Sequence, residues 1–60
     1  MSERAVVSIN TAAEMYDISR ATLRDAVNAG RLPAKRVGRA IRIRVSDLRD
    51  WFDALEDVNP

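Results

Sequence analysis

The hydrophobic positions between Asp17 and Asn28 recur at the spacing of an α-helix with one buried side. Ser19 is placed to cap the start of this helix by accepting a backbone N–H bond. Gly30 is placed to end it, because glycine tolerates the left-handed turn that is common after a helix. The predicted inward residues are Leu23, Ala26 and Val27. The outward side carries Arg20, Ala21, Arg24 and Asn28. We expect this outward side to contact the ligand.

A shorter helix is expected before it, with two alternative starts. Ser8 as the N-cap gives a helix over residues 9–16, whereas Thr11 and Glu14 match a capping box and give a helix over residues 12–16. We favour Ser8, because the alternative helix would have barely more than one turn. The expected inward positions are Ile9, Ala12, Ala13 and Tyr16.

The two helices are separated by Asp17 and Ile18 alone, and so short a turn forces them to cross steeply. Asp17 is expected to adopt a positive φ, because aspartate is one of the few non-glycine residues that tolerate it. Ile18 would fill the space between the helices. Upstream, residues 5–9 are apolar and β-branched, and they form either a short strand or an apolar lead-in.

After Gly30 the period of the pattern changes to that of a strand. Pro33 prevents the helix from continuing and favours an extended chain before it. Apolar and basic residues then alternate through residues 41–45, and Gly38 with Arg39 marks a turn. The pattern predicts a β-hairpin with one apolar face and one arginine face. The arginines assigned to that face are Arg36, Arg39, Arg42 and Arg44.

A last amphipathic helix is predicted near the C-terminus, with Ser46 as its N-cap and Asp47 in its first turn. Its apolar side carries Leu48, Trp51, Phe52 and Leu55. We expect this stripe to supply much of the core, in preference to binding a partner. The outer side is acidic and carries Asp50, Asp53, Glu56 and Asp57. Residues 1–60 are expected to form a single domain with a core of about residues 6–56, and residues 58–60 are expected to fray.

The charge of the chain is segregated, although the net charge of its 60 residues is only +1. Residues 1–19 carry a net charge of −2, residues 20–44 carry +7 and residues 45–60 carry −4. Seven of the eight cations in the middle segment are arginines, whose planar guanidinium suits phosphate groups and guanine edges. This local field favours a polyanionic partner over the alternative of a solvated basic face.

The composition argues against catalysis. The sequence contains neither cysteine nor histidine, so it lacks disulfides, the usual zinc ligands and the common general base. A chain of this size buries only about 60% of its unfolded surface, which leaves no room for a catalytic cleft. Tyr16 is the one tyrosine, and the histidine that a tyrosine nucleophile would need is missing. We therefore expect no enzymatic activity, no cofactor and no metal.

The sequence also indicates where the chain works. No apolar run approaches the ~20 residues of a membrane span, and the N-terminus lacks the apolar segment of a signal peptide. We expect a soluble protein in the cytoplasm of a bacterial host cell, associated with the nucleoid when bound and making no membrane contact.

The predicted order of elements is helix, tight turn, helix, basic hairpin, helix, which is typical of an α+β winged helix-turn-helix. In that fold the second helix enters the major groove of double-stranded DNA, and the hairpin, or wing, reaches phosphates or the minor groove. Arginine can read guanine and asparagine can read adenine. The expected base readers are Arg20, Arg24 and Asn28. Arg39 is the expected minor-groove probe at the hairpin tip. The expected phosphate contacts are Lys35, Arg36, Arg42 and Arg44.

Two motifs within this layout resemble a known family. The segments ISRATLR (residues 18–24) and GRLPAKRVGR (residues 30–39) are similar to those of small MerR-like winged-helix DNA-binding domains of the excisionase family. The resemblance covers nearly the whole chain, and it implies DNA binding through the second helix and the wing. The implied contacts are Ser19, Arg20, Ala21, Thr22 and Arg24 on the helix and Arg36, Gly38 and Arg39 on the wing. The chain departs from the family at Asp17, where glycine is common.

Because the chain runs from Met1 to Pro60, we expect no sensor or recombinase domain, and it resembles a free-standing excisionase of a phage or mobile element. Such a recombination directionality factor binds repeated sites near an attachment site, bends the DNA and directs an integrase towards excision. The expected partners are therefore DNA, an integrase and further copies of the chain bound cooperatively. Two alternatives stay open. One is a small phage or plasmid transcriptional regulator with the same DNA face, and the other is a protein-binding adapter that uses the acidic third helix.

Overall fold

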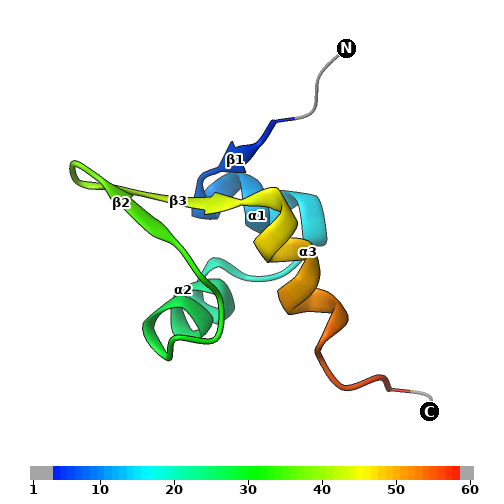
Figure 1. Cartoon of the computed structure of the whole chain (residues 1–60). Coiled ribbons are helices and arrows are strands. Elements are labelled where there is room, and N and C mark those ends of the chain that lie inside the picture. The colour runs from blue at the N-terminus through cyan, green and yellow to red at the C-terminus, as the bar shows by residue number, and fades with distance from the viewer. Residues whose placement is uncertain (1–3, 59–60) are drawn as a thin grey trace.

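The computed structural model describes residues 4–58, which form three helices and three strands (Figure 1). In chain order the elements are β1 (Val6–Val7), α1 (Ile9–Tyr16), α2 (Arg20–Asn28), β2 (Lys35–Val37), β3 (Ala40–Arg44) and α3 (Val45–Asp53). Within this range no helix has the length and apolar character needed to cross a membrane. Residues 58–60 were expected to fray, and two of them, residues 59–60, lie outside the described range.

Helix α1 begins at the earlier of the two expected starts. Ser8 is its N-cap, and the Ser8 hydroxyl accepts a hydrogen bond from the backbone N–H of Thr11 at 3.1 Å. The helix ends at Asp17, whose φ of 55° lies in the left-handed region, as expected for the corner. Ala12 and Ala13, two of the expected inward residues of α1, are both buried. The choice of Ser8 over Thr11 is confirmed.

Helix α2 also follows the prediction. Ser19 caps it, and its hydroxyl accepts a hydrogen bond from the backbone N–H of Thr22 at 3.1 Å. Gly30 follows the C-cap with a φ of 79°, a conformation that glycine adopts without steric cost. Leu23 and Ala26 are buried on the inward side. The sequence therefore defines both ends of α2 and the side on which it packs.

The sheet is antiparallel, with the strand order β1-β3-β2. Strands β2 and β3 form the predicted hairpin, which turns at Gly38, with a φ of 63°, and Arg39. Residues 5–9 contain a strand, since Val6 pairs with Arg44 and Val7 with Ile43. The sheet is thus three-stranded, where the sequence predicted a two-stranded hairpin with an undecided lead-in.

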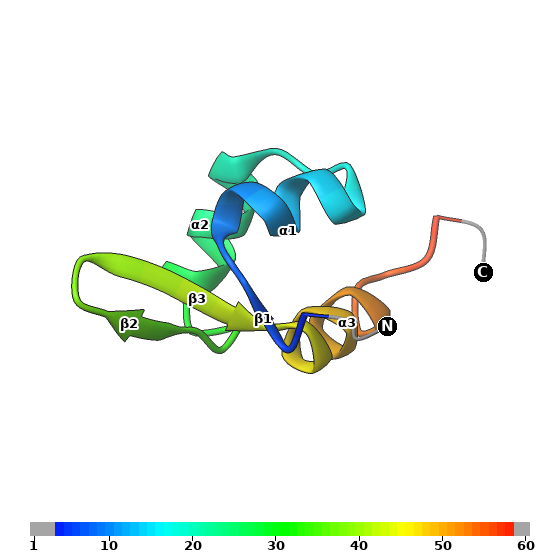
Figure 2. The same cartoon turned by 90° about the horizontal axis from the view of Figure 1, so that it is seen from above.

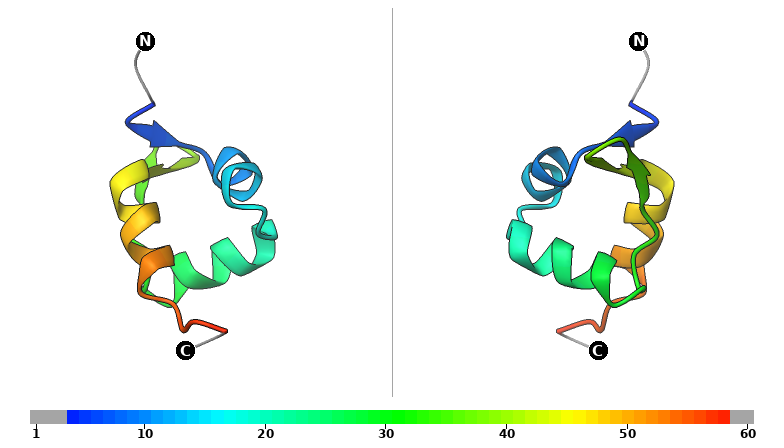
Figure 3. Two further views of the ribbon diagram at one scale, coloured as in Figure 1. Left: turned by 90° about the vertical axis from the view of Figure 1, so that its right-hand side faces the viewer. Right: turned by 90° about the vertical axis from the view of Figure 1, so that its left-hand side faces the viewer.

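The core lies between the three helices and one face of the sheet (Figures 2 and 3). Its largest fully buried side chains are Leu23, Leu32, Ile43 and Leu48. The backbone N–H groups of Arg31 and Leu32 both donate to the carbonyl of Ala26, at 3.0 and 3.2 Å, which holds the chain close to the end of α2. The molecule is a small α+β winged helix-turn-helix: α1 and α2 form the helix-turn-helix, and the β2–β3 hairpin forms the wing.

The start of α3 differs from the prediction. Arg44 occupies the N-cap and makes no side-chain cap hydrogen bond, so the assignment of Ser46 as N-cap was wrong. The cause is a pairing distant in sequence. The N–H of Val45 donates to the carbonyl of Ala5 at 2.9 Å, and β1 thereby holds the chain extended up to the residue where the helix begins. Ser46 consequently lies inside the first turn of α3.

The apolar stripe of the last helix is only partly in the core. Leu48 is fully buried and Trp51 is half-buried, but Phe52 and Leu55 are 43% and 45% exposed. Helix α3 ends before Leu55, and Phe52 packs against Tyr16 with the ring centroids 5.0 Å apart. The stripe was expected to supply much of the core. Leu48 and Trp51 do so, whereas Phe52 and Leu55 lie at the surface.

Candidate nucleic-acid interface

The outward side of α2 is exposed along its whole length. Arg20, Ala21, Arg24 and Asn28 are all exposed, as the helical period predicts. Arg20, Arg24 and Asn28 follow one another at intervals of four residues, so they form one stripe of hydrogen-bonding side chains. Such a stripe can present guanidinium and amide groups together to the edges of base pairs.

The start of α2 adds a second polar feature. The hydroxyls of Ser19 and Thr22 lie 2.8 Å apart, and both residues are exposed. The first backbone N–H groups of a helix and its dipole favour an anion at this end. Two hydroxyls and a helix start are therefore available to a phosphate group at the same end of the helix from which Arg20 extends.

Arg20 is linked to the first helix. Its Nη1 donates a hydrogen bond to Oδ1 of Asn10 at 3.4 Å, and both side chains are exposed. This bond connects α1 to α2 across the outer surface of the helix-turn-helix. Asn10 was not among the residues predicted to lie at this surface. The sequence does hold a hint of this role, because Asn10 is a polar residue able to form hydrogen bonds in the first turn of α1, two positions after the cap.

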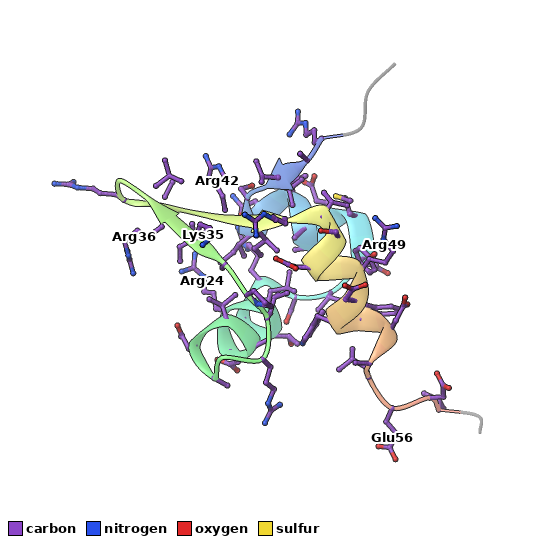
Figure 4. All side chains as sticks on the ribbon, viewed as in Figure 1. Arg24, Lys35, Arg36, Arg42, Arg49 and Glu56 are labelled. Carbon is purple, nitrogen blue, oxygen red and sulfur yellow. The ribbon has the colours of Figure 1, made fainter. Side chains whose placement is uncertain are left out.

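A hollow of about 240 Å³ brings α1, α2 and the wing together. Arg24 lines it from α2, Arg39 and Arg42 line it from the wing, and Ser8 and Asn10 line it from the start of α1. Figure 4 shows Arg24 extending from α2 towards the hairpin. The fold thus joins cations that are far apart in the sequence, and a hollow with this lining suits a polyanion.

The wing divides its cations between two faces. Lys35 pairs with Arg42, so their side chains share one face, whereas Arg36 pairs with Ile41 and lies on the other. That other face also carries the fully buried Ile43. Figure 4 shows Arg36 and Arg42 on opposite sides of the hairpin. The prediction of a single arginine face was wrong for Arg36, because adjacent strand residues point to opposite faces.

The wing residues differ in their exposure to solvent and in their hydrogen bonds. Lys35, Arg36, Gly38 and Arg39 are exposed. Arg42 is half-buried, and its Nη1 donates a hydrogen bond to the carbonyl of Ile41 at 2.9 Å. Arg44 lies apart from the tip, because it pairs with Val6 and lines a different hollow. The structure therefore groups Arg39 and Arg42 with α2 and separates Arg44 from them.

These features define a class of protein, a winged helix-turn-helix with an arginine-lined hollow between its second helix and its wing. The model of the helix-turn-helix domain family matches residues 6–55, and the chain belongs to that family. It is a DNA-binding family, so membership supports DNA as the partner. No curated protein and no solved structure gave a match to the chain.

Proposed function

We propose that this protein is a sequence-specific architectural DNA-binding protein, an excisionase of a phage or mobile element. The family supports DNA binding, and the resemblance of residues 18–24 and 30–39 to MerR-like excisionases supports the finer role. In that role the protein binds repeated sites near an attachment site, bends the DNA and directs an integrase towards excision.

The observation that carries the proposal is the hollow shared by Arg24, Arg39 and Arg42. In the proposed complex α2 lies in the major groove and the wing tip reaches the adjacent minor groove. The proposed contacts are Ser19, Arg20, Ala21, Thr22, Arg24 and Asn28 on α2, and Lys35, Arg36, Gly38, Arg39 and Arg42 on the wing. Arg44 is left out of this set because it lies at the other end of β3.

Bending follows from gripping two grooves at once. A rigid unit that holds a helix in one groove and a wing in the next gains contacts when the duplex curves towards it. Bending a short site costs of order 1–6 kcal/mol, which added phosphate and groove contacts can offset. The fold supports this role because the wing projects beyond the core while α2 lies beside it (Figure 1).

The experiment is a selection of bound duplexes from a random-sequence library, followed by circularly permuted gel shifts on the enriched site. We expect one enriched motif, a permutation-dependent mobility that reports a bend, and a matching repeat near an attachment site. Enriched motifs that map only to promoters would replace the excisionase role by that of a transcriptional regulator. The absence of any enriched motif would contradict sequence-specific binding.

A further inference from the structure

Four cations of the chain lie outside the proposed DNA contacts. The contacts on α2 and the wing use six of its ten lysine and arginine residues, and the four left over are Arg4, Arg31, Arg44 and Arg49. Arg4 precedes β1, Arg44 ends β3 and Arg49 lies in α3. Although they come from three parts of the chain, these three arginines line one pair of hollows, whereas Arg31 lines another. The fold therefore gathers a second group of cations away from α2 and the wing tip.

The two hollows adjoin, because Arg4 and Arg49 line both of them. One, of about 570 Å³, lies between β1, α1 and α3, and the other, of about 350 Å³, also includes Arg44. We call Arg4, Arg44 and Arg49 the basic patch. Within the described part of the chain no aspartate or glutamate lines either hollow, whereas Thr11 and Ser46, which carry hydroxyl groups, do. The basic patch is therefore a site of concentrated positive charge.

The guanidinium groups of the basic patch are available to a ligand. Arg4, Arg44 and Arg49 are all exposed. In the part of the chain that the structure describes, the arginine side chains that donate hydrogen bonds are those of Arg20 and Arg42. Arg44 is the N-cap of α3 but makes no side-chain cap hydrogen bond. An external anion would therefore replace water at the three groups of the patch without breaking a hydrogen bond inside the protein.

The basic patch lies away from the surface proposed to bind DNA. Figure 4 shows Arg24 beside the hairpin and Arg49 on the opposite side of α3. Arg39 precedes β3 and Arg44 ends it, so these two arginines lie roughly 17 Å apart along the strand. A duplex held by α2 and the wing tip therefore leaves the basic patch uncovered.

We propose that the basic patch is a second DNA-binding surface, which contacts the phosphate backbone of a duplex segment other than the one held by α2 and the wing. Phosphate contacts are commonly made by arginine and by serine or threonine hydroxyls, and these are the polar side chains that line the two hollows. The planar guanidinium binds two phosphate oxygens at once, and all three cations of the patch are arginines. Because such contacts carry no sequence information, we expect this surface to bind duplexes of any sequence.

The inference rests on the proposed function, because recombination acts on two DNA segments that must be brought together. A protein with two DNA surfaces holds one segment through α2 and the wing and the other through the basic patch. Three phosphate contacts predict weak binding of the second segment, with a dissociation constant of about 10⁻⁴ M and a log–log salt slope of about −3. The first surface is expected to have a slope of about −5, so the salt dependence separates the two surfaces.

The experiment first loads the protein with an equal amount of unlabelled selected duplex. This complex is then titrated into a fluorescent scrambled duplex and followed by anisotropy. Specific binding exceeds non-specific binding by at least about 10³-fold, so the scrambled duplex does not displace the selected one. We expect the wild-type complex to bind the scrambled duplex at about 10⁻⁴ M, and Arg44→Ala/Arg49→Ala to bind it at least about tenfold more weakly.

Two control proteins separate the basic patch from bulk charge. Arg44→Lys/Arg49→Lys keeps both charges and should bind the scrambled duplex within about threefold of wild type. Arg31→Ala removes an exposed arginine outside the patch and should leave this binding unchanged. All of these variants should bind the selected duplex as wild type does, because they leave α2 and the wing tip intact.

Amide NMR supplies a readout that does not depend on the first surface. In the Arg24→Ala/Arg39→Ala protein, a short scrambled duplex should shift the amide signals of Arg44, Val45 and Arg49. Adding Arg44→Ala/Arg49→Ala to that protein should abolish these shifts.

Three outcomes decide between the alternatives. The inference is overturned if the loaded wild-type protein binds no scrambled duplex, or if this binding survives Arg44→Ala/Arg49→Ala. It is also overturned if a peptide rich in glutamate and leucine shifts the signals of the patch while the duplex does not, and the patch is then assigned to an acidic protein. Failure of wild type to bind the selected duplex contradicts the proposed function instead, and the NMR result still decides whether the basic patch binds DNA.

Discussion

Arg20 and Asn10 join the two helices of the helix-turn-helix through a hydrogen bond of 3.4 Å on the outer surface of the molecule. The bond restricts Arg20, the first residue of the proposed base-reading stripe. Asn10→Ala should free that side chain and weaken specific binding by about 0.5–1 kcal/mol, or about two- to fivefold. Because both residues are exposed, the melting temperature should change little. Anisotropy titrations and a thermal melt check both expectations, and unchanged affinity would show that Asn10 does not position Arg20 for DNA binding.

Arg24 is the side chain at which α2 meets the wing, since it lines the same hollow as Arg39. Arg24→Ala should cost about 1–3 kcal/mol on the selected site and much less on a scrambled duplex. Arg31→Ala is the matched control: it removes an exposed arginine beyond the end of α2 that lines a different hollow. Equal losses for the two variants would show that Arg24 supplies only bulk charge.

The wing tip should contribute to the salt dependence of binding. If about six cations contact phosphates, log K should fall against log salt with a slope of about −5. Arg39→Ala should make that slope less steep by about 1 if Arg39 neutralises one phosphate. Titrations at four or more salt concentrations measure the slope for both proteins. A slope identical to that of wild type would place Arg39 away from the backbone.

The division of α3 between core and surface is testable by stability. Leu48 is fully buried, so Leu48→Ala should lower the free energy of unfolding by about 2–5 kcal/mol. Leu55 is 45% exposed, and Leu55→Ala should cost under about 1 kcal/mol. Urea unfolding followed by circular dichroism compares them. If Leu55→Ala lowers the free energy of unfolding as much as Leu48→Ala, the second half of the apolar stripe is buried in the core after all.

The corner between α1 and α2 carries a small strain. Asp17 has a φ of 55°, and a left-handed conformation costs a non-glycine residue about 1–2 kcal/mol. Asp17→Gly removes that cost but adds freedom to the unfolded chain, so a net gain of about 0.5–1 kcal/mol is expected. Asp17→Val should destabilise by more than this gain, because β-branched residues rarely adopt positive φ. Thermal melts of wild type and the two variants give their order of stability. An Asp17→Val variant as stable as wild type would contradict the expected order.

Local signals in the sequence predicted much of the fold. Ser8 and Ser19 are caps whose partners lie three residues away, and Asp17 and Gly30 mark backbone conformations that few residues adopt. Each of these signals depends only on nearby residues, so the sequence displays it directly. The outward stripe of α2 followed from the helical period once its two ends were known.

Features set by distant contacts were not predictable in the same way. The start of α3 depends on the pairing of β1 with β3, seen in the hydrogen bond from Val45 to Ala5. The hollow at Arg24 is lined by residues from α1, α2 and the wing, which are far apart in the sequence, so no local pattern predicts it. The predicted face of Arg36 was wrong for a different reason. The alternation of side chains along a strand already places Arg36 on the opposite face of β2 from Lys35.

If α2 and the wing read DNA together, removing one arginine from each should abolish specific binding, and one titration measures this directly. Wild type and the Arg24→Ala/Arg39→Ala variant are titrated into the selected duplex and a scrambled duplex of equal length at the same salt concentration. Wild type should bind tightly to the selected duplex alone, and the variant should bind both duplexes weakly and with equal affinity. Equal, weak binding of wild type to both duplexes would contradict it and leave the arginines as a general electrostatic feature.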